Sequence, residues 1–104
     1  MSGAIQDVAD CYNVCLDTIT HSLEKGGKHA SVEHLLILID CADICKLTER
    51  SMRLGSPVHQ ILCDTCALIC DECAKHCESL GGKEMEECAA SCRKCAESCR
   101  SMAE

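Results

Sequence analysis

The residues in this sequence with the most distinctive chemistry are its thirteen cysteines, in a chain of 104 residues. A thiolate is a ligand for soft metal ions, and globular proteins rarely carry so many. Nine of them follow steps of three and four residues within two segments, at Cys63, Cys66, Cys70, Cys73 and Cys77, and at Cys88, Cys92, Cys95 and Cys99. These are the steps of the buried a and d positions of a helical bundle. We therefore expect the thiols to line the interior of a bundle.

The remaining four cysteines form two C-x-x-x-C pairs, Cys11/Cys15 and Cys41/Cys45. On a helix, residues at this spacing have β carbons roughly 5–6 Å apart. A disulfide requires about 3.5–4.5 Å, so the pairs are poorly placed for oxidation on an intact helix. An odd number of cysteines also prevents complete pairing within one chain. A metal ion bonded to two sulfurs at about 2.3 Å bridges a wider gap, so the spacing predicts metal binding.

Cu(I) is the metal ion that this pattern favours. It accepts two or three thiolate ligands, whereas Zn(II) requires a closed tetrahedron of four ligands. A ladder of thiol pairs along helices suits the lower coordination number. If each sulfur bridges two copper ions, the capacity approaches about one Cu(I) per cysteine. Zn(II) can substitute in such a site.

Other roles for the cysteines compete with copper binding. A zinc buffer or a zinc-structured bundle is the principal alternative. An iron–sulfur electron carrier is the next, since C-x-x-C occurs at 63/66, 70/73 and 92/95. Ferredoxin ligands, however, usually lie on loops in C-x₂-C-x₂-C runs. Buried cysteine as a small apolar residue is common for one or two positions rather than thirteen. Redox catalysis by C-x-x-C lacks the accompanying βαβ pattern.

Four segments of helical periodicity must position the cysteines, and we expect helices over residues 4–24, 32–54, 57–80 and 83–103. Ser31 is a suitable N-cap for the second helix, and Gly55 ends it. For the third helix we expect Ser56 as N-cap and Pro57 as the first helical residue, with Gly81 at its end. The short connections predict a single all-α domain, an up-down-up-down antiparallel four-helix bundle with a cysteine-lined core.

The composition limits the classes of function. A net charge of −7 argues against a nucleic-acid partner, which requires a basic surface. The longest apolar run, residues 35–39, is too short to span a membrane. The N-terminal residues lack the basic start and apolar run of a secretory signal, so we expect a cytoplasmic protein, whose thiols are kept reduced. Neither a Ser/His/Asp set nor a Gly-rich phosphate loop occurs, so we do not expect an enzyme.

The helical phase of the cysteines continues into methionine and histidine residues at the helix ends. At the end of the second helix this phase reaches Met52, at the start of the third it reaches His59, and at the end of the fourth it reaches Met102. These three helix ends meet in an up-down bundle. Thioether and imidazole groups bind Cu(I) more weakly than thiolate does. We predict that these three residues ring the mouth through which metal enters. His34 and Met85 continue the phase at the opposite end.

These cysteine pairs resemble those of the bacterial copper storage proteins, in the cytosolic branch of that family of four-helix bundles. The resemblance covers nearly the whole chain and rests on Cys11/Cys15, Cys41/Cys45, Cys66/Cys70, Cys73/Cys77, Cys88/Cys92 and Cys95/Cys99, with Cys63 left over. It implies a store that holds many Cu(I) ions inside each bundle, takes them in at one end past His or Met residues, and assembles as a homotetramer.

The first two helices carry more apolar residues than one face of a small bundle needs. These lie outside the cysteine stripe, at Leu16, Ile19, Leu23, Leu35, Leu36, Ile37, Ile39, Ile44 and Leu47. A surplus apolar patch commonly marks an interface between proteins. The sequence therefore also predicts a homo-oligomer.

Overall fold

The computed structural model describes residues 2–103, which form four α-helices and one short 3₁₀ helix. These are α1 (Ser2–Lys25), η1 (Gly27–Ala30), α2 (Val32–Leu54), α3 (His59–Leu80) and α4 (Lys83–Ala103). No strand occurs within this range. The predicted all-α fold class is thereby confirmed.

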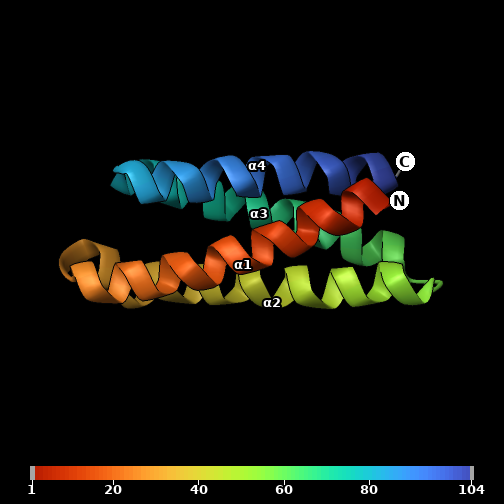
Figure 1. The fold of residues 1–104 in the computed structure, drawn as a ribbon, viewed down its shortest axis with the longest axis horizontal. Helices are drawn as coiled ribbons and strands as arrows, with labels where there is room; N and C mark the ends of the chain where they lie inside the picture. Colours follow the sequence, from red (N-terminus) through yellow and green to blue (C-terminus); the bar gives the residue numbers. More distant parts are fainter. Residues whose placement is uncertain (1, 104) are drawn as a thin grey trace.

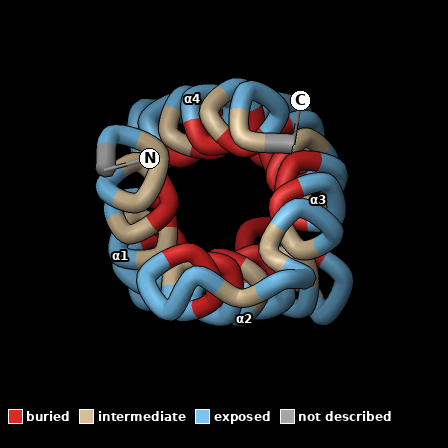
Figure 2. The backbone as a smooth tube through the Cα atoms, turned by 90° about the vertical axis from the view of Figure 1, so that its right-hand side faces the viewer, coloured by how far each residue is buried: buried red, intermediate tan, exposed pale blue. Residues whose placement is uncertain are grey.

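The helices form a ring in which each one packs against two neighbours. α1 contacts α2 and α4, and α3 contacts the same two helices from the other side. Successive helices run in opposite directions along a bundle of 42 × 18 × 17 Å (Figure 1). Viewed along the bundle, the buried residues of all four helices face the central axis (Figure 2). This is the predicted antiparallel four-helix bundle.

Both ends of α2 lie at the capping residues that the sequence predicts, Ser31 and Gly55. The hydroxyl of Ser31 accepts a hydrogen bond from the backbone N–H of His34 at 3.2 Å, as an N-cap does. At the other end Gly55 adopts the left-handed conformation, with φ of 66°. Its N–H donates to the carbonyl of Met52, and the N–H of Ser56 donates to that of Ser51. This bonding pattern is a Schellman motif and ends the helix.

The start of α3 differs from the prediction. The helix begins at His59 rather than at Pro57, and its N-cap is Val58 rather than Ser56. The N–H of Ser56 is already used in the Schellman motif of α2, so Ser56 belongs to the turn between the helices. Its hydroxyl accepts from the N–H of Val58 at 3.3 Å, and its carbonyl accepts from the N–H of His59 at 3.2 Å. These bonds delay the helix by two residues.

The core is built from small side chains. Apart from the cysteines it contains five buried alanines, and its largest buried apolar side chains are Leu38, Met52, Met85 and Val8. Small residues let neighbouring helices approach one another and leave the central volume to sulfur. None of the described helices combines the length with the apolar character needed to cross a bilayer.

Candidate metal centre

All thirteen cysteines are free thiols with 0% of their surface exposed. Each of the four helices supplies at least two of them, and α3 and α4 supply nine. The helices place the thiols inward because the cysteines fill the a and d positions of the bundle. The predicted cysteine-lined core is therefore present.

Ten of the sulfurs form four overlapping tetrads, in each of which every sulfur lies within 4.8 Å of the other three. In order along the bundle, the tetrads are Cys15/Cys73/Cys88/Cys92, Cys11/Cys15/Cys41/Cys92, Cys11/Cys41/Cys45/Cys70 and Cys45/Cys66/Cys70/Cys95. Consecutive tetrads share two sulfurs. The ten sulfurs therefore form one continuous array, called the sulfur column below.

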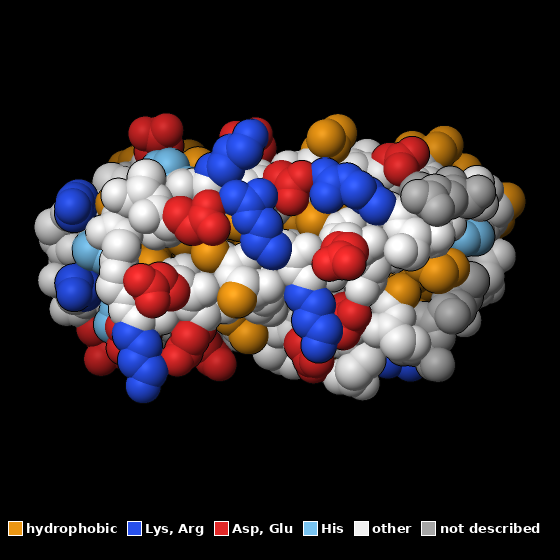
Figure 3. Space-filling model, turned by 90° about the horizontal axis from the view of Figure 1, so that it is seen from above, with side chains coloured by type: hydrophobic (Ala, Val, Ile, Leu, Met, Phe, Trp, Pro, Cys, Tyr) orange, Lys and Arg blue, Asp and Glu red, His pale blue; other side chains and the backbone are white. Residues whose placement is uncertain are grey.

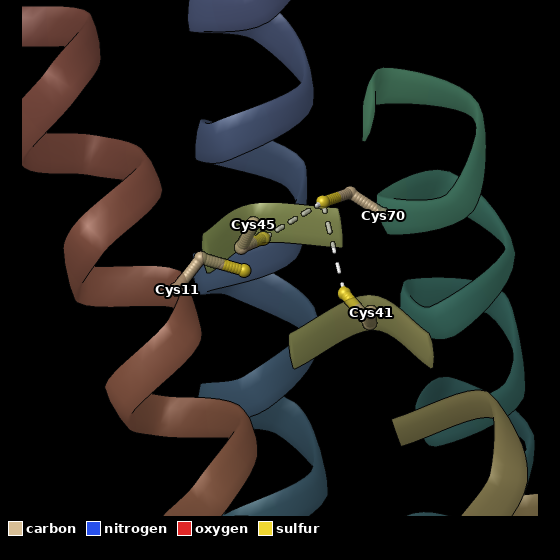
Figure 4. A group of neighbouring side chains, drawn as sticks. All are labelled: Cys11, Cys41, Cys45 and Cys70. Atoms are coloured by element: carbon tan, nitrogen blue, oxygen red, sulfur yellow. Dashed lines mark hydrogen bonds between the residues drawn. The ribbon is translucent and has the colours of Figure 1, made fainter. Parts of the chain in front are cut away.

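The sulfurs of the column meet mainly across helices. Figure 4 shows the third tetrad, in which Cys11 comes from α1, Cys41 and Cys45 from α2, and Cys70 from α3. The Cys70 sulfur lies 3.7 Å from that of Cys41 and 3.8 Å from that of Cys45. Within one helix, the sulfurs of Cys66 and Cys70 are 3.9 Å apart. A C-x-x-x-C pair is thus one edge of a tetrad rather than an isolated pair.

These separations match those of metal–thiolate clusters. With metal–sulfur bonds of about 2.3 Å, sulfurs around a three-coordinate ion lie about 4.0 Å apart, and sulfurs around a tetrahedral ion about 3.8 Å apart. Contacts in the column run from 3.6 Å to 4.0 Å. The column needs little rearrangement to accept three-coordinate ions, whereas linear coordination requires neighbouring sulfurs to separate to about 4.6 Å.

Three cysteines, Cys63, Cys77 and Cys99, lie outside the tetrads and extend the column at its ends. Hydrogen bonds from Cys73 and Cys88, together with burial, raise the pKa of the Cys77 thiol. Hydrogen bonds from Cys66 and Cys95, together with burial, raise the pKa of the Cys99 thiol. Burial, and repulsion from Cys66 when that thiol is ionised, raise the pKa of Cys63. Without metal, these thiols are therefore protonated at neutral pH.

The three residues predicted to form the mouth lie where α2 ends, α3 begins and α4 ends. Met52 is 2% exposed, while His59 and Met102 are half-buried. His59 Nδ1 lies 2.8 Å from the Ser56 carbonyl oxygen, to which it donates a hydrogen bond. This bond fixes the tautomer and leaves the lone pair on Nε2 available to a metal ion.

The opposite end of the bundle contains a histidine pair that the sequence prediction did not include. His34 is fully buried, and its ring stacks on that of His76, with ring centroids 5.1 Å apart. The Nδ1 atoms of the two rings lie 3.0 Å apart, and His34 Nε2 lies 3.2 Å from Ser22 Oγ. Burial and the neighbouring His76 lower the pKa of His34. Both nitrogens of His34 are thus engaged, and Met85 is buried at the same end.

His29 is also buried at this end. It belongs to η1, a helix that the sequence did not predict, and its Nε2 lies 3.4 Å from the carbonyl oxygen of Gly81. This contact ties the connection between α1 and α2 to the connection between α3 and α4. His76 lies outside the helical phase of the cysteines on α3, so cysteine spacing gave no signal for its contact with His34.

Solved structures share this architecture. The Cu(I)-bound form of copper storage protein BsCsp3 is 34% identical, covers 99% of this chain and 97% of its own, and has a TM-score of 0.94. The apo form of copper storage protein 3 from Bacillus subtilis is 36% identical, covers 97% and 96%, and has a TM-score of 0.87. The Nmul_A1745 protein from Nitrosospira multiformis is 46% identical, covers 96% and 91%, and has a TM-score of 0.91.

Sequence comparisons agree with the structural ones. The uncharacterized cysteine-rich protein YhjQ of Bacillus subtilis strain 168 is 35% identical over 65 residues, which is 62% of this chain. The match covers 60% of that relative's length, which is less than two thirds of it. The sequence profile of the family described as "Csp: Copper storage protein" matches residues 1–104. The chain therefore belongs to the copper storage protein family.

Proposed function

We propose that this protein stores Cu(I), bound as cargo by the thiolates of the sulfur column and of Cys63, Cys77 and Cys99. The observation that carries the proposal is the continuity of the column, in which neighbouring tetrads share two sulfurs. Shared sulfurs can bridge successive copper ions, so the bundle interior serves as one multinuclear site.

The charge of the interior favours Cu(I) over Zn(II). One Cu(I) and one thiolate together are neutral, so many ions can accumulate without building up charge. A Zn(II) ion with four thiolates carries two negative charges, which are costly to bury without a partner. Among the side chains that the structure describes, no lysine or arginine is buried. The same argument disfavours an iron–sulfur cluster, whose four thiolates also leave net negative charge.

Anaerobic titration of the reduced apo-protein tests this proposal. Cu(I) is added against a competing chelator, and the bound metal is counted after gel filtration. A store should hold many more than three Cu(I) ions per chain and remain colourless. A zinc site should instead saturate at about three ions, because each consumes about four thiolates. Saturation with three or fewer Cu(I) ions, or a brown protein with stoichiometric iron and sulfide, would contradict the storage function.

The mouth of the store is, in this proposal, the end formed by Met52, His59 and Met102. Its support is the free Nε2 of His59, in contrast to His34, whose ring nitrogens are both engaged. Ser51 adds a second observation, because its buried hydroxyl oxygen has no hydrogen-bond partner among the described residues. Buried polar atoms of this kind are usually satisfied by water. Water at this end would accompany a passage for ions.

We also propose that the protein is a cytoplasmic homo-oligomer. The exposed apolar side chains support a homo-oligomer, and the family resemblance implies a tetramer. We place the protein in the cytoplasm because thirteen free thiols are maintained in a reducing compartment. We assign it storage of metal rather than catalysis.

A further inference from the structure

The apolar side chains on the outside of the bundle are distributed unevenly. Among the described residues, ten large apolar side chains are exposed, and eight of them lie on α2, on α3 or in the turn between these helices. They include Leu36, Leu47 and Leu54 of α2, and Ile61 and Leu68 of α3. By contrast, α4 has none, and charged groups of both signs are spread over the face on its side (Figure 3). One side of the bundle therefore carries the features of an interface.

A groove of 530 Å³ runs between α2 and α3 on this side. Apolar residues, among them Ile44, Leu47 and Leu68, form its lining together with three acidic residues. The acidic residues are Asp40, Asp43 and Glu72. A partner that fits this groove must present apolar side chains next to basic ones.

The outer stripe of α2 itself meets this requirement. Along the helix it reads Leu36, Asp40, Asp43, Leu47, Arg50 and Leu54, and all six residues are exposed. Four of the six positions of this stripe meet a complementary residue when the stripe is paired with its own reversal. When two copies run antiparallel with their midpoints at position 45, Leu36 faces the partner's Leu54 and Asp40 faces the partner's Arg50. The remaining pair places Asp43 opposite the partner's Leu47.

The charged residues of this stripe are unpaired within the described part of the chain. Asp40, Asp43 and Arg50 take part in no salt bridge there, whereas Lys46 and Arg53 on the same helix both pair with Glu49. Unpaired charges of opposite sign, placed symmetrically about one point, form two ion pairs in an antiparallel dimer and like-charge contacts in a parallel one. The antiparallel arrangement is also the one that closes with two-fold symmetry.

We propose that two copies of this chain associate through α2, antiparallel about a two-fold axis opposite position 45, with Asp40 of each bonded to the partner's Arg50. The proposal names the face and the residue pairs of the homo-oligomer proposed above and rests on that part of the proposed function. The partner's Leu47 enters the apolar groove, and the partner's Arg50 reaches its acidic rim. The copper core is separate from this face, because every cysteine points inward.

Charge reversal tests the pairing. Sedimentation of the reduced apo-protein over a range of concentrations is measured for the wild type, for Asp40→Arg, for Arg50→Asp and for the double variant. Each single variant places like charges opposite each other, so we expect the dissociation constant of this step to rise at least about tenfold. The double variant restores opposite charges and should return to the wild-type value. Glu97→Arg on α4, also an exposed charge outside any described salt bridge, is the matched control and should behave as wild type.

The possible results distinguish the α2 pairing from the homo-oligomer itself and from copper storage. A wild-type dimer or tetramer of the 11.3 kDa chain whose mass is halved by each single variant, but not by the double variant, supports the α2 pairing. An oligomer unaffected by either single variant, or not restored by the double one, overturns the pairing but leaves the homo-oligomer standing. A wild-type monomer at all concentrations overturns both. Circular dichroism confirms that each variant is folded, and unchanged Cu(I) capacity in the single variants shows that storage is independent of this face.

Discussion

The sulfur of Cys70 on α3 lies 3.6 Å from the sulfur of Cys95 on α4, the shortest of the sulfur contacts in the described part of the chain. Cys70 also contacts Cys41 and Cys45 of α2 and Cys66 of its own helix. Sulfurs from three helices thus converge on one side chain. Cys70 belongs to two tetrads and stands at the point where they join.

The first prediction concerns this junction. Replacing Cys70 with serine removes a ligand shared by two tetrads, and a hydroxyl is a poor ligand for Cu(I). We expect Cys70→Ser to bind about two fewer Cu(I) ions, or more, and to lose the most tightly held ones. Cys77→Ser is the matched control, because Cys77 lies in no tetrad and its loss should remove about one ion or fewer. Competitive titration measures both variants, and equal losses would contradict a column built from shared sulfurs.

The second prediction concerns pH. The pKa values of Cys63, Cys77 and Cys99 are raised in the folded apo-protein, so the folded state holds these protons more tightly than the unfolded state. Their contribution to stability is fully present below the unfolded thiol pKa of about 8.5 and is lost as pH rises above it. We therefore expect the melting temperature of the apo-protein, kept reduced, to fall as the pH is raised from neutral into this alkaline range.

The copper-loaded protein provides the control for this pH dependence. Its thiolates are bound to metal and have no proton to lose, so its melting temperature should change much less over the same range. Thermal melts of both forms, followed by circular dichroism, make the comparison. An apo-protein whose melting temperature stays constant to strongly alkaline pH would show that the thiols ionise without cost in the folded bundle.

Much of this bundle was predictable from residue spacing alone. The inward orientation of the cysteines follows from their a and d positions, and the N-cap at Ser31 and the left-handed Gly55 follow from local rules. These features depend on one helix at a time. The role of Met52, His59 and Met102 as weak metal ligands is a prediction that the loading experiment below tests.

Contacts that depend on the exact shift and rotation of one helix relative to another could not be predicted. Spacing along α3 gives the Cys66–Cys70 pair, but the approach of Cys70 to Cys95 depends on how far α3 and α4 are shifted and rotated relative to each other. The stacking of His34 on His76 depends likewise on α2 and α3 together. The late start of α3 reflects the competing use of Ser56 by the end of α2.

The third prediction concerns removal of the metal. Ser31 and Gly55 cap the two ends of α2, and protonated cysteines pack as small apolar residues alongside the buried alanines. We expect the apo-protein to show strong helical circular dichroism and to melt at a higher temperature after Cu(I) is added, because binding to the native state adds stability. A random coil without metal would instead indicate folding that depends on metal, as in zinc fingers.

The last prediction concerns the passage of copper into the core. Replacing Met52, His59 and Met102 together by leucine removes the weak ligands at the proposed mouth and leaves all thirteen thiols in place. We expect Cu(I) to load and leave more slowly, while the final capacity stays close to that of the wild type. The matched control is the joint replacement of His34 and Met85 by leucine at the other end. There the nitrogens of His34 already bond to Ser22 and His76, so the control should load at nearly the wild-type rate.

Stopped-flow loading of the two variants, with identical chelator concentrations, decides between the ends. Slow loading of the Met52/His59/Met102 variant alone places the mouth where α2 ends and α3 begins. Slow loading of the His34/Met85 variant alone would place the mouth at the opposite end of the bundle, where the ions would pass the stacked histidines. Unchanged rates in both would mean that ions enter between helices through local opening, and that these methionines and histidines only fill the ends of the core.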